Sequence, residues 1–406
     1  MDTYATILLW VIPGFLILVF IEILYGYYIK KQTYTLMDTI SSLSSGITNI
    51  LKDSMGIILI IISYPFLEKK IALFQLESSL TLYLIAFICI DFASYWSHRL
   101  NHKINIFWNQ HIIHHSSEEF NLACALRQSV SNIIGYNALF LIPAAILGVP
   151  SEIIIFLSPI HLFGQFWYHT QHIGKLGFLE YIFVTPSQHR VHHAINPIYI
   201  DKNLSAIFCI WDRIFGTFQE ELDDVKPIYG TLKPVQTWNP IIINFQHFFR
   251  LAKDSWHTKK FSDKIKIWFM PTGWRPKDVE NLIKYKSQSK NQEKYYPNYT
   301  NLFKLVGVFH FLCVNTILTY FLYNFSDLQI DIKLIYTLII FLSVFGYSSL
   351  MDKYSWAPFF EVFRSLLSLY LINSIGEITS FKLFLYIYLF TSITISFLIL
   401  KKEGSI

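Results

Sequence analysis

The chain has 406 residues, of which 53% are hydrophobic and only 15% are charged, and its formal net charge is +5. A soluble globular protein carries about 25% charged residues, so this composition excludes an ordinary soluble domain and indicates an integral membrane protein. The modest charge gives no indication of nucleic-acid binding. The four widely separated cysteines indicate neither a disulfide framework nor a thiolate metal site.

Long apolar segments recur along the chain. About 20 apolar residues are needed to cross a bilayer as a helix, and the segments that approach this length are 6–28, 44–66, 78–97, 130–149, 151–168, 302–324, 330–350, 356–374 and 379–400. The second is the weakest, because Lys52 and Asp53 interrupt it. The sequence therefore predicts an all-α integral membrane protein with about nine transmembrane helices.

Basic residues indicate the orientation of these helices. Short loops rich in Lys and Arg stay in the cytoplasm, and Lys30 and Lys31 directly follow the first apolar segment. Alternation then places the segments 98–129 and 169–301 in the cytoplasm, with the N-terminus outside and the C-terminus inside. This predicts a multi-pass protein of a bacterial inner membrane or of the endoplasmic reticulum.

Histidines are concentrated in one region, because 11 of the 14 lie between residues 98 and 193. The string "HRLNH" places two of them four apart, and "HIIHH" and "HRVHH" repeat the spacing His-x-x-His-His. The residues are His98 and His102, then His111, His114 and His115, and finally His189, His192 and His193. Positions i, i+3 and i+4 share one face of an α-helix, so each motif is expected to direct its imidazoles at one point. Thr185 and Gln188 predict a capping box at the start of the third helix.

Eight imidazoles exceed the needs of a single metal ion. Nitrogen ligands without thiolates suit iron, zinc or copper, and a pair of irons held by imidazoles is able to bind and activate O₂. We therefore expect these eight residues to hold two metal ions on the cytoplasmic side of the membrane.

The other histidines need separate interpretations. His169 follows the fifth apolar segment at the membrane boundary, and we expect it to be a ninth ligand. His172 shares the same helical face, and its role stays open. His161 lies eight residues earlier and about 12 Å deeper, at 1.5 Å per residue, so we expect it to make a polar contact between helices. The isolated histidines, expected to be structural or solvated, are His247, His257 and His310.

Carboxylates that orient metal-bound imidazoles are expected close to the motifs. The candidates are Asp91, Glu118, Glu119 and Asp201, each of which also suits a surface or capping role. Arg127 suits either the binding of a polar head group or the orientation of the chain by its charge.

The three histidine motifs resemble those of the fatty acid hydroxylase/sterol desaturase superfamily of integral-membrane di-iron enzymes. That superfamily carries His-x3-His, His-x2-His-His and a later His-x2-His-His, in the order found here. Longer strings, including "FWNQHIIHHSSEEFNLA", "TPSQHRVHHAINP", "IWDRIFGTF", "PIYG" and "TGWRP", resemble its alkylglycerol monooxygenase branch. The resemblance is strong over 91–219 and looser over most of the chain.

The resemblance implies two iron ions and an O₂-dependent hydroxylation of the carbon next to the ether oxygen of a glycerol ether lipid. The resulting hemiacetal would collapse to a fatty aldehyde and glycerol. The chain has no dinucleotide or flavin fingerprint, so electrons must come from a partner protein or from a diffusible reductant, which the resemblance suggests is tetrahydrobiopterin. We expect no catalytic side chain beyond the metal ligands. The branch usually has Glu where this chain has Lys103, which puts its use of the pterin or the metal in question.

Two other functions are compatible with the sequence. One is a sterol or fatty-acid desaturase or hydroxylase that uses the same iron site. The other is a membrane haem protein or metal transporter, but transport would need ionisable groups near the middle of the bilayer, whereas these histidines lie at the ends of apolar segments. The expected division is 1–80 N-terminal membrane helices, 81–220 catalytic domain, 221–300 polar cytoplasmic segment and 301–406 C-terminal membrane helices.

Overall fold

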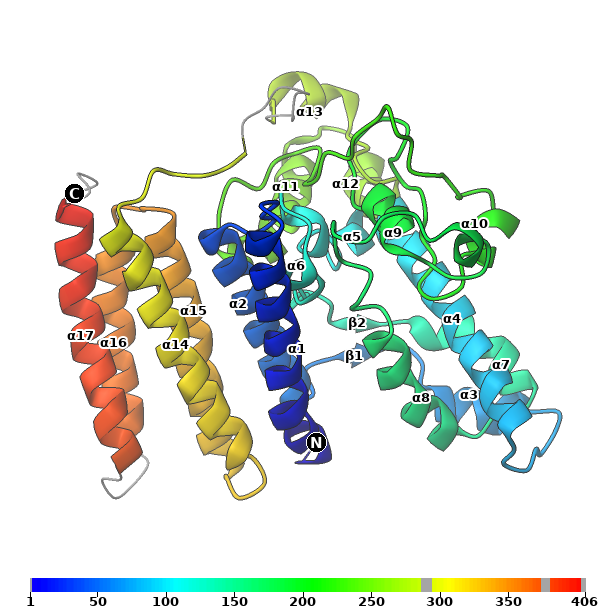
Figure 1. Ribbon diagram of the computed structural model, residues 1–406, viewed down its shortest axis with the longest axis horizontal. Coiled ribbons are helices and arrows are strands. Elements are labelled where there is room, and N and C mark those ends of the chain that lie inside the picture. Colours follow the sequence, from blue (N-terminus) through cyan, green and yellow to red (C-terminus); the bar gives the residue numbers. More distant parts are fainter. Residues whose placement is uncertain (1, 286–293, 374–379, 403–406) are drawn as a thin grey trace.

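The computed structural model describes residues 2–285, 294–373 and 380–402. Over these residues the chain forms helices and one pair of two-residue parallel strands (Figure 1), which confirms the predicted helical fold. Small parts of the expected polar segment 221–300 and of the last two apolar segments lie outside the described residues. The elements are α1 (Asp2–Tyr28), α2 (Leu36–Ser54), β1 (Leu59–Ile60), α3 (Tyr64–Ile71), α4 (Leu80–Lys103), α5 (Asn105–Trp108), η1 (His114–Ser116), α6 (Leu122–Ala125), β2 (Ile134–Gly135), η2 (Asn137–Leu141), α7 (Ile142–Ile146), α8 (Ser151–Phe163), η3 (Gly177–Tyr181), α9 (Pro186–His192), α10 (Ile210–Ile214), α11 (Pro240–His257), α12 (Phe261–Phe269), α13 (Lys277–Leu282), α14 (Asn301–Tyr323), α15 (Ile330–Met351), α16 (Ala357–Asn373) and α17 (Ser380–Lys402).

The C-terminal helices α14–α17 form a bundle in which helices adjacent in sequence also pack together (Figure 1). Helices α1 and α2 pack against α14, and α2 also contacts α15. The centre of this group is filled by buried apolar side chains that include Val314, Ile317, Phe321, Ile340 and Val344. In a bilayer such helices associate through close packing and polar contacts, since lipid is as apolar as the side chains themselves.

Helix α4, which carries the first histidine motif, lies in a second group. It packs against α8, η2 and α7, and small side chains such as Ala86, Ala144 and Ala145 are fully buried at these contacts. Small residues allow helix backbones to approach closely. This packing fixes the direction of α4, and therefore the place at which its last turn presents histidines.

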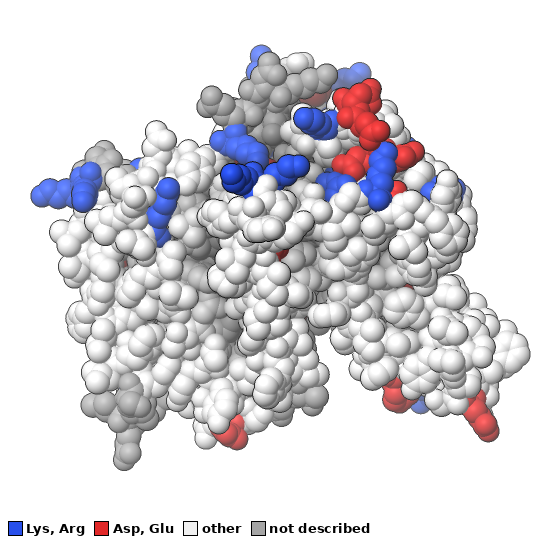
Figure 2. All heavy atoms as spheres, in the orientation of Figure 1, with Lys and Arg blue, Asp and Glu red and all other residues white. Residues whose placement is uncertain are grey.

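A cap covers one end of both helix groups. It contains α5 and α9–α13 with their connecting loops (Figure 1). Lys and Arg gather on the cap and on the neighbouring helix ends, whereas the sides of the molecule carry almost no charge (Figure 2). Helix α1 begins at the end away from the cap, and α17 ends on the side of the cap (Figure 1). The histidine motifs therefore lie at the basic end of the molecule.

Among the described residues, five helices are long and apolar enough to cross a membrane, namely α1, α4, α14, α15 and α17. Their outward surfaces carry large exposed apolar side chains, among them Phe20, Leu24, Leu84, Leu312, Ile387 and Phe390. Apolar outward surfaces on helices whose backbone groups are internally bonded suit contact with lipid. The protein is a multi-pass membrane protein.

Three of the predicted spans are not single long helices. The segment 44–66 is wrong as a span, because α2 ends at Ser54 and a turn at Gly56 (φ 64°) leads to β1. The segment 130–149 contains β2, η2 and the short α7, and α8 has only 13 residues. The expected count of nine transmembrane helices is therefore not confirmed.

Helix α2 shows why the apolar pattern was misleading. Its serine-rich face is buried inside the protein, where the hydroxyl of Ser41 donates to Trp238 O at 2.7 Å and that of Ser45 donates to Gln128 O at 2.6 Å. Lys52 Nζ donates to Asn132 O at 3.1 Å. Helix α2 is thus an internal strut that joins the bundle to the loops of the cap.

A buried ion pair fixes the register of the C-terminal bundle. On α16, Arg364 Nη2 lies 2.6 Å from Glu361 Oε2, and the guanidinium also donates to Ser343 Oγ and Ser392 Oγ. Gly346 of α15 lies against the same carboxylate, so that a Cβ at this position would collide with Glu361 Oε1.

We expect Gly346→Ala to destabilise the protein, although alanine favours helices over glycine by about 1 kcal/mol. The added methyl group would force Glu361 away from Arg364, and such overpacking costs about 1–3 kcal/mol. Thermal unfolding of the purified protein in detergent measures the change in midpoint. The matched control is Gly14→Ala in α1, where no described atom lies within 4 Å of the added Cβ. Equal midpoints for the two variants would show that the contact is unimportant.

Candidate metal centre

The first histidine motif occupies the last turns of α4. His98 and His102 are four residues apart and share one face of the helix. Nδ1 of His98 donates to Leu204 O at 2.8 Å, and Nδ1 of His102 lies 3.4 Å from Asp201 Oδ1. A carbonyl or carboxylate oxygen accepts hydrogen bonds, so both rings carry their proton on Nδ1. The lone pairs of the two Nε2 atoms remain available for a metal.

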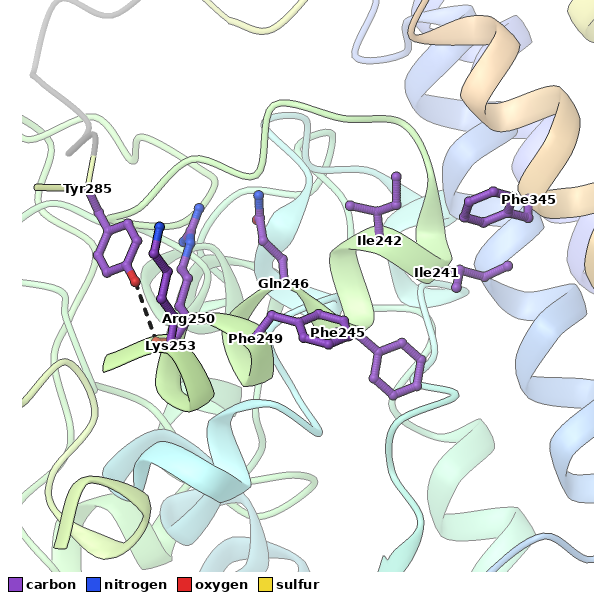
Figure 3. A pocket seen from close by; sticks show the side chains of 9 residues that line it. All are labelled: Ile241, Ile242, Phe245, Gln246, Phe249, Arg250, Lys253, Tyr285 and Phe345. Carbon is purple, nitrogen blue, oxygen red and sulfur yellow. Dashed lines mark hydrogen bonds between the residues drawn. The ribbon is translucent and has the colours of Figure 1, made fainter. Parts of the chain in front are cut away.

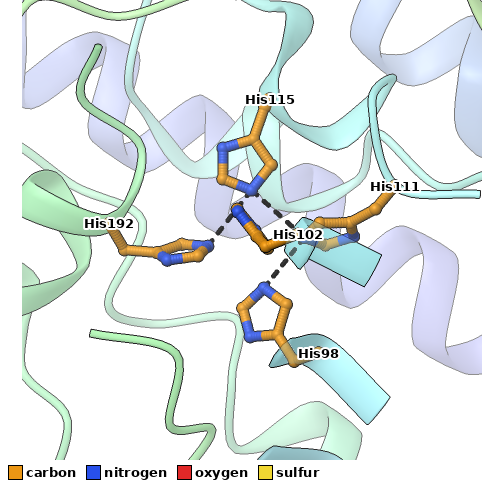
Figure 4. Close-up of side chains that lie close together, drawn as sticks. All are labelled: His98, His102, His111, His115 and His192. Carbon is orange, nitrogen blue, oxygen red and sulfur yellow. Dashed lines mark hydrogen bonds between the residues drawn. The ribbon is translucent and has the colours of Figure 1, made fainter. Parts of the chain in front are cut away.

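Five histidines converge beside the end of α4 (Figure 4). The members of this five-histidine cluster are His98, His102, His111, His115 and His192. The Nε2 atom of His111 lies 2.9 Å from that of His98 and 3.1 Å from that of His115. The Nε2 atom of His115 is also 3.1 Å from that of His192. Three segments far apart in sequence thus direct the same ring atom to one place.

The remaining four clustered histidines form a second group beside the first. The members of this four-histidine cluster are His114, His169, His189 and His193. The Nε2 atom of His169 lies 3.4 Å from that of His114 and 2.8 Å from that of His189, which is 3.0 Å from that of His193. The rings of His115 and His193 stack with centroids 4.3 Å apart, so the two clusters are in direct contact.

The distances between ring nitrogens fit metal coordination. Two nitrogens each about 2.1 Å from one ion are about 3.0 Å apart at a right angle and about 3.4 Å apart at the tetrahedral angle. The observed separations run from 2.8 to 3.4 Å. Lone pairs that face one another at this range repel, and a cation between them removes the repulsion. Within the described part of the chain, Nε2 of His102 is buried without a hydrogen-bond partner, as expected for a ligand atom.

Burial keeps the imidazoles of the four-histidine cluster neutral. It lowers the pKa of His114 to about 3, with His169 adding to the effect, and it lowers the pKa of His169 to about 3. The pKa values of His189 and His193 fall well below the usual range for the same reason, with further lowering by neighbouring histidines. Only the neutral ring can bind a metal, so the group formed by His114, His169, His189 and His193 is ready for coordination at physiological pH.

Each His-x-x-His-His motif divides its rings between the two clusters, which corrects the expectation that one motif points at one place. In the second motif His111 and His115 join the five-histidine cluster, while His114 joins the other. In the third motif the assignment is reversed, since His189 and His193 join the four-histidine cluster. The second motif is also a turn that leads into η1 rather than an α-helix.

The loop 201–205 orients three rings of the five-histidine cluster, and sequence reasoning recognised only part of it. Asp201 Oδ1 faces His102, while Lys202 O and Leu204 O accept from the Nδ1 atoms of two further rings, those of His192 and His98. Asp212 holds the loop by accepting from Leu204 N at 2.7 Å and from the next backbone N–H at 3.0 Å. Positive φ at Asp201 (57°) accompanies this tight path. The string "IWDRIFGTF", which contains Asp212, was the sequence feature that could have indicated the role of this loop.

Of the four carboxylates predicted to orient imidazoles, only Asp201 contacts a clustered histidine. Asp91 instead accepts from Ile207 N, Phe208 N and the Trp211 indole. Glu118 accepts from Tyr295 N, and Glu119 pairs with Lys294; both are therefore corrected to structural roles.

Two basic residues singled out by sequence also have defined partners. Lys103 Nζ lies 2.7 Å from Asp201 Oδ2, so it binds the carboxylate that faces His102. Arg127 is buried and pairs with Asp38 at 2.7 Å, which rules against a head-group contact. Its carbonyl oxygen accepts from Nδ1 of His114 at 3.3 Å, so Arg127 positions the four-histidine cluster.

The other histidines lie outside both clusters. His161 Nε2 donates to Asp91 Oδ1 at 2.8 Å, which confirms the predicted contact between helices. His172 packs edge-on against Tyr25, and Nε2 of His172 is buried without a partner among the described residues. The isolated histidines contact Asn105 O, Lys253 O and Tyr388 Oη, for His247, His257 and His310 respectively.

The start of α9 agrees with the sequence only in part. Thr185 is the N-cap, as predicted, and Pro186 is the first helical residue, but the capping box is wrong. The hydroxyl of Thr185 donates to Glu180 Oε1, and Gln188 Nε2 donates to Glu180 O. Glu180, which no sequence pattern indicated, therefore fixes the beginning of the helix that carries the third motif.

Comparison with known proteins agrees with this arrangement. The family model for fatty acid hydroxylase matches residues 83–217, which include all nine clustered histidines. Alkylglycerol monooxygenase from Homo sapiens is 40% identical over 268 residues, which are 65% of this chain and 59% of the human protein, less than two thirds of its length. No solved structure matches the chain.

Two further relatives align over most of their length. Alkylglycerol monooxygenase from Xenopus tropicalis is 35% identical over 369 residues, which are 88% of this chain and 80% of the frog protein. The protein of the same name from Danio rerio is 33% identical over 374 residues, which are 90% of this chain and 82% of the fish protein. The chain belongs to the alkylglycerol monooxygenase family, a family of oxygen-dependent lipid monooxygenases.

Proposed function

We propose that each histidine cluster holds one iron ion. The observation that carries this proposal is the pair of adjacent clusters, in which the imidazoles bring their ring nitrogens within 4.8 Å of one another. Iron is the metal among those compatible with nitrogen ligands that suits an oxygen-dependent lipid monooxygenase. The proposed ligands are His98, His102, His111, His115 and His192 for one ion and His114, His169, His189 and His193 for the other.

We propose that the reaction is hydroxylation of an ether lipid, because the relatives are named alkylglycerol monooxygenases. Bound iron would supply the activation of O₂. One oxygen atom enters the C–H bond next to the ether oxygen, and the other leaves as water after taking up two electrons and two protons. The hemiacetal then collapses to a fatty aldehyde and a free glycerol hydroxyl. We assign this chemistry to residues 81–220.

The two electrons must come from outside the chain, and we propose tetrahydrobiopterin as their source. The cap is the polar part of the molecule beside the clusters, so a water-soluble reductant reaches the site from that side. The lipid enters laterally from the bilayer. The basic residues next to the ends of two membrane helices, Lys30 and Lys31 after α1 and Lys401 and Lys402 at the end of α17, support a cytoplasmic position for the cap by the positive-inside rule, with the N-terminus outside.

Iron content tests the metal assignment. We expect about two iron ions per purified chain, because nine ligands exceed the coordination number of one ion. His192→Ala and His114→Ala each remove a ligand from a different cluster and should lower bound iron and abolish turnover. His257→Ala is the control, since His257 is exposed and bonds only to Lys253 O among the described residues. Elemental analysis that found one zinc and no iron would refute the di-iron proposal.

Aldehyde release tests the reaction. Iron-loaded protein supplied with an alkylglycerol, O₂ and tetrahydrobiopterin should form a fatty aldehyde in proportion to the pterin consumed. Omission of either O₂ or pterin should stop the reaction. Turnover of a sterol or an acyl lipid, without turnover of the ether lipid under any reductant, would identify a desaturase or hydroxylase of another lipid instead.

Lys103→Glu tests the departure from the family pattern. The exposed ion pair of Lys103 with Asp201 contributes roughly 0.2–1 kcal/mol, so its loss should leave the fold intact. We expect aldehyde release at a rate at least equal to that of the parent protein, because an acid is usual at this position. Lys103→Gln removes the charge without adding an acid. A lower rate for the glutamate variant than for the glutamine variant would show that an acid here is harmful.

A further inference from the structure

A groove of about 390 Å³ runs along one face of α11, away from the histidine clusters. One end of the groove is apolar and the other end is polar (Figure 3). The apolar part is lined by Ile241, Ile242, Phe245, Phe249 and Phe345, the last of which belongs to the membrane helix α15. The polar part is lined by Gln246, Arg250, Lys253 and Tyr285.

The opposite face of α11 is occupied by contacts with the rest of the protein. Asn244 Oδ1 accepts from Ser129 Oγ at 2.8 Å, and Nε2 of His247 lies 3.0 Å from Asn105 O. Both side chains are buried. The groove is therefore separate from the candidate metal centre, with which it shares no lining residue.

The polar end of the groove has more positive charge than the described residues neutralise. Arg250 Nη1 is buried and has no hydrogen-bond partner among them, and no described carboxylate pairs with Arg250 or with Lys253. The nearest acid, Asp254, is occupied, because Arg275 binds both of its oxygens and Tyr285 donates to one of them. A bound anion would pair with the cationic side chains of Arg250 and Lys253.

The lowered pKa values of two cationic side chains agree with this excess of positive charge. Burial lowers the pKa of the Arg250 guanidinium. Burial also lowers the pKa of Lys233, which lies over the Tyr285 ring, and the neighbouring charges of Arg275 and Arg250 lower it further. A cation whose pKa is lowered by burial and by like charges gains stability from a nearby anion.

The surroundings of the groove indicate an amphiphile rather than a free ion. The apolar end opens beside a membrane helix, and the polar end belongs to the basic cap. Phe249 is 66% exposed and Trp256 is 81% exposed on the same helix, and aromatic side chains of this kind favour the boundary between lipid and water. The cytoplasmic leaflet supplies anionic phospholipids.

We propose that this groove binds an anionic phospholipid. Its phosphate group lies at Arg250 and Lys253, and one acyl chain lies along Phe245, Phe249 and Phe345. The lipid is a bound structural ligand and not a substrate, so the proposal requires neither iron nor turnover.

Direct binding tests the proposal. The purified full-length protein in uncharged detergent is titrated with phosphatidylglycerol that carries a fluorophore on one acyl chain, and anisotropy gives the dissociation constant. Arg250→Gln with Lys253→Gln should weaken binding by at least about tenfold, because two charge-assisted contacts are lost. Lys401→Gln with Lys402→Gln removes the same charge from exposed residues at the end of α17 and should bind as the parent does.

Further measurements distinguish a phospholipid head group from free phosphate as the bound anion. Phe249→Ser should weaken binding of the lipid without lowering the thermal midpoint, because Phe249 is largely exposed. Millimolar inorganic phosphate should not displace the probe, and unlabelled phosphatidylglycerol should displace it better than phosphatidylcholine with the same chains. Displacement by free phosphate, equal competition by phosphatidylcholine, or unchanged binding in the Arg250/Lys253 double variant would each overturn the proposal.

Discussion

The rest of the structure depends on one constraint, which is that nine buried or half-buried imidazole rings direct their Nε2 lone pairs at one another. Such an arrangement is unfavourable without a cation at its centre, so other parts of the protein must hold the rings in place through their Nδ1 atoms. Backbone carbonyls do much of this, because Leu204 O, Lys202 O, Gln165 O and Arg127 O accept from the Nδ1 atoms of four rings. The path of the main chain therefore determines where the ligand atoms lie.

Buried carboxylates in turn determine the path of the main chain. Asp212 and Asp91 accept backbone N–H groups from the loop after the third motif, and Asp38 pairs with Arg127 next to the second motif. All of these acids are nearly inaccessible to solvent. A fully satisfied polar network in a low-dielectric interior fixes one arrangement, which a metal centre with nine ligands requires.

The sequence predicted which residues form the site better than it predicted how these residues are arranged. Spacing selected the eight motif histidines, and position at the end of an apolar segment selected His169 while excluding His161; the structure brings the selected nine together. The division of each motif between two clusters was not predictable, because it depends on how η1 and α9 face each other across the site. The strut role of α2 was hidden as well, since the predicted span 44–66 joined the second half of this helix to the apolar residues 57–62 that follow it. The acceptors of the loop 201–205 are largely backbone atoms, which no side-chain pattern reveals.

The position of the clusters relates the fold to the proposed chemistry. In a glycerol ether lipid, the carbon next to the ether oxygen is the first carbon of the alkyl chain, so it lies where the head group meets the hydrocarbon. The clusters lie at the corresponding level, at the last turn of α4 and beneath the polar cap (Figure 1). A lipid that stays in the bilayer would thus bring its reactive carbon to the site without leaving the membrane. The groove on α11 also belongs to the cap, so a phospholipid bound there would hold α11, and with it α5, at a fixed depth relative to the membrane surface.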